Sequence, residues 1–253
     1  MIGVSCTNFC TKMPEEVLDS LVGRFELWEI FSEAEHSIEY HLGMFEEILQ
    51  TYDLSYTLHS PICDINIASL SDKMREASVR EISSNAIAAN KLGIEKMVVH
   101  PGLASMAVDG TAEVATERSK WAMTFLERVS KEYGVTIAIE NMPSMKFFLG
   151  QTADDLARIV DGTDLSICLD IGHANTTGQL DEIIDKLGDR IAHVHIHDNH
   201  GETDEHLTLG EGNIDFEDVL AKLNGYDGDF IIESRSLESA IESQKVLDGL
   251  LYE

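Results

Sequence analysis

Histidines and carboxylates stand at the ends of several short apolar runs in this chain. The runs YTLH, VVH, TIAIE, SICLD and FIIE end at His59, His100, Glu140, Asp170 and Glu233. Imidazole and carboxylate together, without thiolates, suit Zn²⁺, Mn²⁺, Fe²⁺ or Co²⁺ and argue against an all-oxygen cage for Mg²⁺ or Ca²⁺. These residue types therefore indicate a divalent metal site.

A further run, AHVHIHD, alternates histidine with aliphatic residues. His193, His195 and His197 are each two positions apart, so in a strand all three side chains lie on one face. The aliphatic face suits packing against helices, and the imidazole face then points inward. A buried imidazole needs a hydrogen-bond partner or a metal, so this run adds to the expected site.

More candidate ligands follow two of these runs. His173 comes on the turn after Asp170, and Asp204 and His206 are two residues apart, so an extended backbone would project them to one side. One ion cannot use so many ligands. Either two or three metals bind, or some of these residues contact the substrate.

The elements that must position these residues alternate along the chain. Short Val/Ile-rich runs are each followed by an amphipathic stretch, eight of each, which predicts a closed (β/α)₈ TIM barrel, an α/β fold, as a single domain over residues 1–253. Parallel strands bring their C-terminal ends to one rim, and that rim is where the metal site is expected. The expected strands are Ile2–Cys6, Phe25–Ile30, Ser55–His59, Lys96–His100, Val135–Glu140, Leu165–Asp170, Ile191–His197 and Asp229–Glu233.

Helix boundaries are expected from capping residues. Pro14 fits a first helical turn, and Gly93 and Gly134 fit helix C-termini. The expected N-caps are Ser71, Thr111, Thr152 with Asp155, and Asp215 with Asp218.

The charge is strongly negative, with 46 acidic against 18 basic residues and a formal net charge of −28. Such a field repels nucleic acid, and no basic cluster offsets it, so a nucleic-acid partner is not expected. No membrane span or leader-like segment is found, and we expect a cytoplasmic protein. The four cysteines are expected to be small buried residues, and His36, His41 and His200 to be solvated.

The motifs resemble those of the xylose isomerase-like TIM-barrel superfamily, which includes sugar phosphate isomerases and epimerases and endonuclease IV. The matching segments are HSPICDINIAS, VVHPG, IEN, CLDIGH, HVHIHD and DEHLTLGEGNID. For endonuclease IV the resemblance implies a trizinc ligand set of His59, His100, Glu140, Asp170, His173, His195, Asp204, His206 and Glu233. For an epimerase it implies one Mn²⁺ or similar ion on Glu140, Asp170, His195 and Glu233.

Two departures separate the chain from the endonuclease pattern. Ile62 stands where that resemblance calls for an aromatic residue that wedges into DNA, and the segment FSEAEHSIEYH is acidic where a basic DNA-reading loop is expected. Both departures, with the net charge, favour a small substrate over DNA.

The first hypothesis is a metal-dependent isomerase or epimerase of a small sugar, sugar phosphate or polyol, working through a metal-stabilised enediolate. Glu140 and Glu233 would exchange the proton and His173 would orient a hydroxyl. Glu29 and Arg235 are candidate substrate contacts, the latter for a phosphate. The alternative is a three-metal phosphoesterase that acts on a small phosphoester. A second alternative is a barrel that binds metal and a metabolite without catalysis. The oligomeric state is left open.

Overall fold

Eight parallel strands close into a barrel in a computed structural model that describes residues 1–252. Each strand pairs with the next in the sequence, and the last strand pairs with the first. The strands are β1 (Ile2–Ser5), β2 (Leu27–Phe31), β3 (Ser55–His59), β4 (Lys96–Val99), β5 (Thr136–Glu140), β6 (Ser166–Asp170), β7 (Ile191–Ile196) and β8 (Phe230–Glu233).

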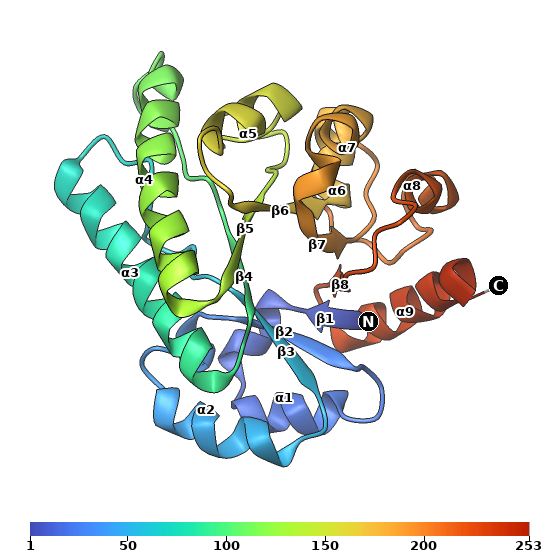
Figure 1. The fold of residues 1–253 in the computed structure, drawn as a ribbon. Coiled ribbons are helices and arrows are strands. Elements are labelled where there is room, and N and C mark those ends of the chain that lie inside the picture. The colour runs from blue at the N-terminus through green and yellow to red at the C-terminus, as the bar shows by residue number, and fades with distance from the viewer. Residues whose placement is uncertain (253) are drawn as a thin grey trace.

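Helices surround the strands as an outer layer (Figure 1). The α-helices are α1 (Pro14–Leu21), α2 (Leu42–Ile48), α3 (Asp72–Leu92), α4 (Ala112–Tyr133), α5 (Ala153–Ile159), α6 (Ile171–Thr177), α7 (Leu180–Leu187), α8 (Phe216–Lys222) and α9 (Leu237–Tyr252). Four 3₁₀ helices add η1 (Thr7–Thr11), η2 (Ala34–His36), η3 (Leu49–Thr51) and η4 (Gly188–Arg190). The predicted (β/α)₈ barrel is confirmed.

The two faces of each strand pack against different surroundings. Outward-facing residues such as Ile137, Ile139 and Leu169 belong to one large apolar cluster with the helices. Inside the barrel a separate small cluster holds Val98, Ala138 and Cys168, one from each of three neighbouring strands. Because small side chains fill this interior layer, larger polar groups such as Glu29 and His193 fit into the barrel beside it.

Most of the expected helix ends are confirmed, although the number of helices is not. Thr152 accepts a hydrogen bond from the Asp155 amide at 3.1 Å, and Asp215 caps α8 in the same way. Gly93 and Gly134 adopt the left-handed conformation at the ends of α3 and α4. Ser71 and Thr111 occupy N-cap positions without a side-chain hydrogen bond. Nine α-helices replace the expected eight among residues 1–252, because both α6 and α7 lie between β6 and β7.

Three smaller expectations about exposure were wrong. His36 is fully buried, because its ring packs against Trp28, which belongs to the large apolar cluster between the strands and the helices. His41 is only partly exposed, whereas His200 is exposed as expected. Cys63 is exposed, while the other three cysteines are buried. Within residues 1–252, no helix has both the length and the apolar character that crossing a bilayer requires.

Candidate metal centre

The carboxyl ends of the strands bring the expected ligands to one rim of the barrel. His59, Glu140, Asp170 and Glu233 are the last residues of β3, β5, β6 and β8, and His100 directly follows β4. All nine residues of the implied trizinc set fall into three adjacent groups. Within each group one potential ligand atom per residue lies within 4.8 Å of the others.

The His59 group consists of His59, His100 and Glu140. The His100 and His59 Nε2 atoms lie 2.9 and 3.4 Å from Oε2 of Glu140. His59 donates from Nδ1 to the carbonyl of Ser60 at 2.8 Å, which leaves Nε2 as the nitrogen with a free lone pair. This group therefore brings two imidazole nitrogens and a carboxylate oxygen to one point, where a cation would take the place of the imidazole–carboxylate contacts.

The central group consists of Glu140, Asp170, His195 and Glu233. His195 Nδ1 lies 3.1 Å from Oε1 of Glu140 and 3.3 Å from Oε1 of Glu233. The two oxygens of Glu140 thus face different groups, Oε2 toward the His59 group and Oε1 toward the central group. Such a carboxylate can bridge two cations.

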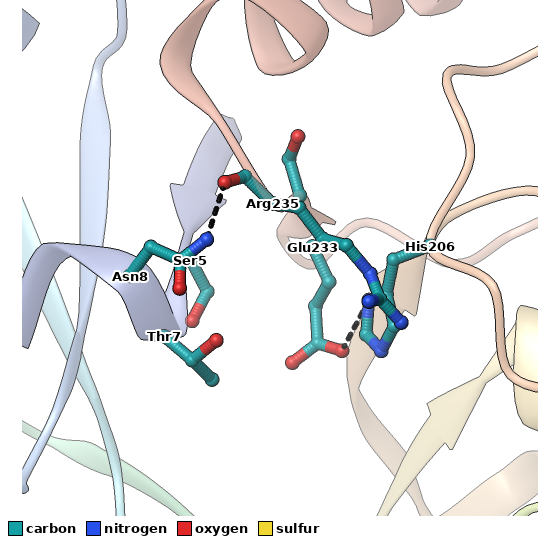
Figure 2. A pocket seen from close by; sticks show the side chains of 7 residues that line it. Ser5, Thr7, Asn8, His206, Glu233 and Arg235 are labelled. Atoms are coloured by element: carbon teal, nitrogen blue, oxygen red, sulfur yellow. Dashed lines mark hydrogen bonds and ion pairs between the residues drawn. The ribbon is translucent and has the colours of Figure 1, made fainter.

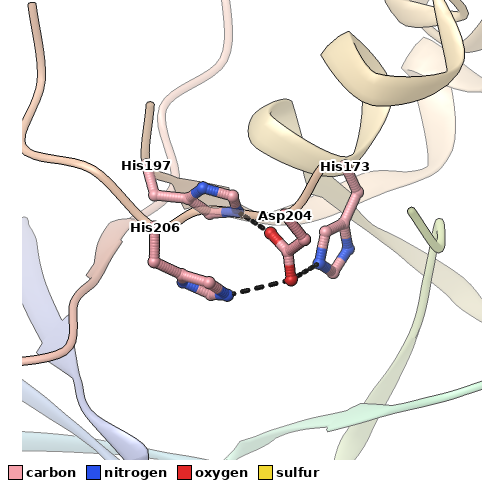
Figure 3. Close-up of side chains that lie close together, drawn as sticks. All are labelled: His173, His197, Asp204 and His206. Atoms are coloured by element: carbon pink, nitrogen blue, oxygen red, sulfur yellow. Dashed lines mark hydrogen bonds and ion pairs between the residues drawn. The ribbon is translucent and has the colours of Figure 1, made fainter. Parts of the chain in front are cut away.

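The His173 group consists of His173, His197, Asp204 and His206 (Figure 3). The Asp204 carboxylate lies in the middle, with Oδ2 at 3.1 Å from His206 and 3.4 Å from His173, and Oδ1 at 3.4 Å from His197. His173 donates from Nδ1 to the carbonyl of Asn141 at 2.9 Å, so its Nε2 faces Asp204. His173 lies in α6 and not on a turn, because α6 begins directly after β6.

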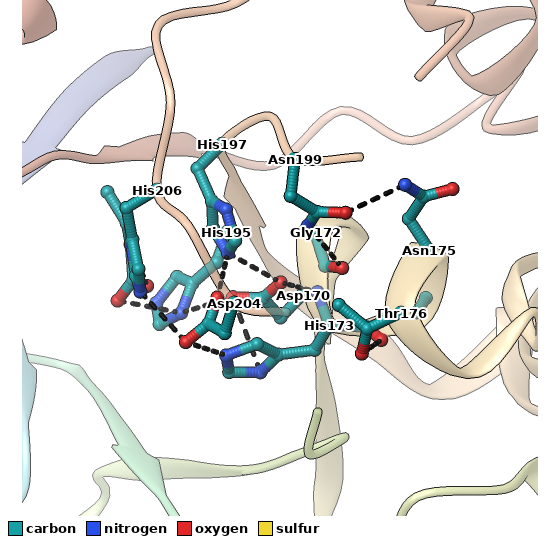
Figure 4. A network of polar contacts seen from close by, with 12 residues as sticks. Asp170, Gly172, His173, Asn175, Thr176, His195, His197, Asn199, Asp204 and His206 are labelled. Atoms are coloured by element: carbon teal, nitrogen blue, oxygen red, sulfur yellow. Dashed lines mark hydrogen bonds and ion pairs between the residues drawn. The ribbon is translucent and has the colours of Figure 1, made fainter. Parts of the chain in front are cut away.

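Hydrogen bonds around Asp170 join the central group to the His173 group (Figure 4). Asp170 Oδ1 accepts from the backbone amide of His173 and lies 3.3 Å from Nε2 of His197. Asn141 is buried beside it and exchanges two hydrogen bonds with the Asp170 backbone, at 2.8 and 2.9 Å. These contacts fix the Asp170 carboxylate between the two groups.

The loop that carries Asp204 and His206 is held by a single buried carboxylate. Asp198 accepts hydrogen bonds from the backbone amides of Asn199, Gly210, Gly212 and Ile214, at 2.8 to 3.3 Å. It also exchanges two backbone hydrogen bonds with Leu207. The position of Asp204 and His206 over the rim therefore depends on Asp198.

Glu29 lies beneath the central group inside the barrel, with no exposed surface. Its Oε2 accepts from Nε2 of His193 at 2.7 Å and from the Thr57 hydroxyl at 3.2 Å. Its Oε1 lies 2.9 Å from Nε2 of His195. The sequence predicted that this buried carboxylate needs partners, and His193 and Thr57 are its hydrogen-bond partners, while His195 lies close to Oε1 without a hydrogen bond among residues 1–252.

A polar cavity of about 260 Å³ opens beside the central group (Figure 2). Glu233 and His206 form one wall and residues near the end of β1, including Thr7 and Asn8, form the other. Arg235 lines the same cavity; its guanidinium donates to the carbonyl of Asp204 at 3.2 Å. No ion pair among residues 1–252 involves Arg235, so its charge is available to an anion.

The electrostatics of the site favour charged carboxylates in an acidic surrounding. Burial alone would raise the pKa of Glu140, but the imidazoles of His100 and His195 outweigh it and hold that pKa well below its usual value. Burial also opposes ionisation of Asp204, yet hydrogen bonds from His173 and His206 lower its pKa strongly. Because the carboxylates stay ionised, they attract cations.

Sequence reasoning missed three residues of this site. His197 was placed on the inward face of its strand but not among the metal ligands, although the same two-residue spacing points it to the rim. Asp198 and Asn141 were not singled out, because their partners are backbone atoms far along the chain. Asn141 directly follows β5 and Asp198 is the second residue after β7, so the one signal that both share is a polar residue within two positions of the end of a buried strand.

A closed parallel barrel with histidines and carboxylates gathered at the C-terminal rim defines the class of protein. The sequence profile of the xylose isomerase-like TIM barrel family matches residues 25–250, and the chain belongs to this family.

Several relatives are similar over much of their length. An uncharacterised protein of Methanocaldococcus jannaschii, MJ1311, is 35% identical over 98% of this chain and 88% of its own length. A probable endonuclease 4 of Acholeplasma laidlawii is 29% identical over 66% of this chain and 62% of its own length.

Solved structures are also similar. A D-tagatose 3-epimerase-like protein has a TM-score of 0.90 and 33% identity, over 99% of this chain and 96% of that chain. A protein called IOLI, solved with a bound zinc atom, has a TM-score of 0.75 and 20% identity, over 99% of this chain and 98% of that chain; at this identity the likeness concerns the fold.

Proposed function

We propose that this protein is a phosphoesterase that holds several divalent metal ions at the rim of the barrel and acts on a small phosphoester. One observation carries the proposal. Glu140 shares its two carboxylate oxygens between the His59 group and the central group, and Asp170 links the central group to the His173 group. An epimerase needs only one such group, whereas hydrolysis by adjacent metals uses several.

The residues present fit metal ions. Buried atoms on three candidate ligands, Oδ2 of Asp170, Nε2 of His197 and Oδ1 of Asp204, have no hydrogen-bond partner, which is costly unless something else binds them. Nitrogen and oxygen donors without sulfur suit zinc or manganese, and the zinc in the IOLI structure supports zinc. When bound, such ions supply a more acidic water and positive charge next to a phosphoryl group.

The chain's own residues supply binding and positioning. Arg235 and Asn8 line the polar cavity, where the unpaired guanidinium would bind a phosphate oxygen. Glu233 is 14% exposed and faces both this cavity and His195, so it would accept a proton from a bound water. Glu140 holds the two neighbouring groups in place.

A sugar isomerase or epimerase is the second candidate function. It is favoured by Glu140 and Glu233, which face the same Nδ1 of His195 from β5 and β8, and by the D-tagatose 3-epimerase-like structure. In that reaction the two glutamates would exchange a proton and His173 would orient a hydroxyl. Glu140, however, is only 1% exposed and enclosed by imidazoles, which leaves little room to reach a carbon-bound proton.

A small substrate fits the charge better than DNA does. The net charge of −28 repels a polyanion, and Ile62 offers no aromatic wedge at the rim. A small phosphoester brings only one or two charges, which bound cations and Arg235 would offset. Cleavage of an abasic-site oligonucleotide at low salt would contradict this part of the proposal.

Metal analysis and two assays test the proposed function. Protein purified without chelator should contain close to three ions per chain, and bis(4-nitrophenyl) phosphate or 4-nitrophenyl phosphate should be cleaved. One ion per chain, with exchange of solvent deuterium into a ketose, would favour the epimerase instead. Glu140→Gln should reduce the metal content by more than one ion, whereas Glu202→Gln, on an exposed loop, should leave it unchanged.

A further inference from the structure

An apolar cavity of about 150 Å³ lies on the opposite side of the metal centre from the polar cavity. His100, a member of the His59 group, forms the wall that the cavity shares with the metal centre. The rest of the wall is largely apolar, formed by Ile62, Ile65, Ile67, Ile82, Leu103 and Phe148. The metal centre thus has a polar cavity on one side and an apolar one on the other.

The walls of this apolar cavity are held by hydrogen bonds between loops. Asn66 accepts from the Leu103 amide and donates to its carbonyl, both at 2.9 Å, which ties the loop after β3 to the loop after β4. Leu103 also pairs with Phe148 on the loop after β5. Gly102 has a φ of +101°, and a Cβ there would lie 2.7 Å from the Cβ of Ala68. The cavity is therefore built by close loop packing and is already formed without a ligand.

One buried polar atom in the cavity lacks a partner. Ser60 lines the cavity and is 1% exposed, and its hydroxyl has no hydrogen bond among residues 1–252. Leaving a buried hydroxyl unpaired costs about 1–3 kcal/mol, so such atoms usually meet a ligand or water. At the mouth, Ile62 is 37% exposed, which places an apolar side chain in water until something covers it.

We propose that this cavity binds an apolar, ring-sized group of the substrate that carries one hydrogen-bonding atom toward Ser60. The inference rests on the proposed function, since it supplies the organic part of the phosphoester. A cavity of about 150 Å³ with apolar walls accommodates a benzene-sized ring. A polyhydroxylated sugar chain fits poorly, because it would bury several hydroxyl groups and the cavity offers only the unpaired hydroxyl of Ser60 as a partner.

The substrate's phosphate would then lie at the metal groups that border this cavity, and its apolar ring would lie beside His100 and Phe148, whose rings are edge-on with centroids 6.5 Å apart. The class of substrate is thus a phosphoester of an aromatic or heterocyclic alcohol.

Binding of phosphonates, which are not hydrolysed, tests this inference without requiring turnover. Calorimetry on zinc-loaded protein should show phenylphosphonate binding at least 10-fold more tightly than methylphosphonate. Phe148→Ala and the more exposed Ile62→Ser should each reduce this preference to less than 3-fold and leave methylphosphonate affinity unchanged. Trp121→Ala, which removes a 43% exposed aromatic on α4, is the matched control and should keep the full preference.

Equal affinity for the two phosphonates, or a preference that survives both cavity variants, would overturn the inference. That result would leave the proposed function intact, since metal content and cleavage of phosphoesters judge it separately. A phenyl preference in a protein that cleaves no phosphoester would instead support the cavity and refute the phosphoesterase. If neither phosphonate binds, the cavity proposal is also wrong, whatever the metal content and the cleavage assays show about the proposed function.

Discussion

Replacing Glu29 by Gln should weaken metal binding although Glu29 is not at the rim. Glu29 accepts a hydrogen bond from His193 Nε2 at 2.7 Å and lies 2.9 Å from Nε2 of His195. The charge of Glu29 close to Nε2 favours a proton on that nitrogen, so a cation can replace the proton that Nδ1 shares with Oε1 of Glu140 at 3.1 Å. The carboxylate beneath the site thus selects the tautomer that can bind metal.

The size of the effect follows from the donors that an amide introduces. If the Gln NH₂ faces His195, that ring must carry its proton on Nδ1, which blocks the metal-binding nitrogen. If it faces His193, the proton must move to His193 Nδ1, which is buried without a partner. Either arrangement costs about 1–3 kcal/mol, and loss of such a supporting group typically reduces metal affinity about 10- to 100-fold.

Two measurements test this prediction. Chelator competition gives the zinc affinity, and ¹⁵N NMR spectra of the imidazoles give the tautomer of His195. Glu26→Gln, on an exposed residue just before β2 at the far end of the barrel, is the control for the lost charge. If Glu29→Gln and wild type bind zinc within twofold of each other and show the same His195 tautomer, the reasoning about the supporting carboxylate is refuted.

Three further predictions concern the surroundings of the site. Asp198→Asn should lower the free energy of unfolding by at least about 2 kcal/mol, because the amide NH₂ would face backbone amides that need an acceptor. It should also reduce the metal bound by the His173 group. Urea unfolding and metal content measure the two effects, and wild-type values for both would contradict the prediction. Gly172→Ala should displace His197, since the added Cβ would lie 2.0 Å from its ring; loss of one bound ion per chain is expected, and an unchanged metal content would contradict it. Burial lowers the pKa of His36 from 6.5 to about 4, so the folded protein resists a proton that the unfolded chain accepts. Stability should therefore fall as the pH drops from about 6.5 to about 4, by at most about 3 kcal/mol from this residue, and level off below. In urea unfolding at a series of pH values, His36→Phe should lose this part of the decrease in the free energy of unfolding. If the free energy of unfolding depends on pH in the same way in both proteins, the prediction is wrong.

The barrel and its rim could be predicted because both depend on local patterns. Alternating strand and helix signals specify parallel strands, and parallel strands carry their last residues to the same rim, so His59, Glu140, Asp170 and Glu233 had to converge. The two-residue period of β7 likewise determined that His193 and His195 face inward, and the same spacing continues to His197 just after the strand. The strand limits differ by at most two residues, since the ends of strands depend on pairing with neighbours.

The division of the ligands into three groups was decided by the tertiary structure. Which oxygen of Glu140 faces which histidine depends on the stagger of β3, β4, β5 and β7 around the barrel, which no local pattern encodes. His197 joined Asp204 and His206 only because Asp198 holds a loop through amides 1 to 16 residues further along the chain. The apolar cavity likewise exists only where loops from three different strands meet. Residue type and period therefore determined that candidate metal ligands gather at one rim, and long-range contacts determined how they are grouped and what can lie beside them.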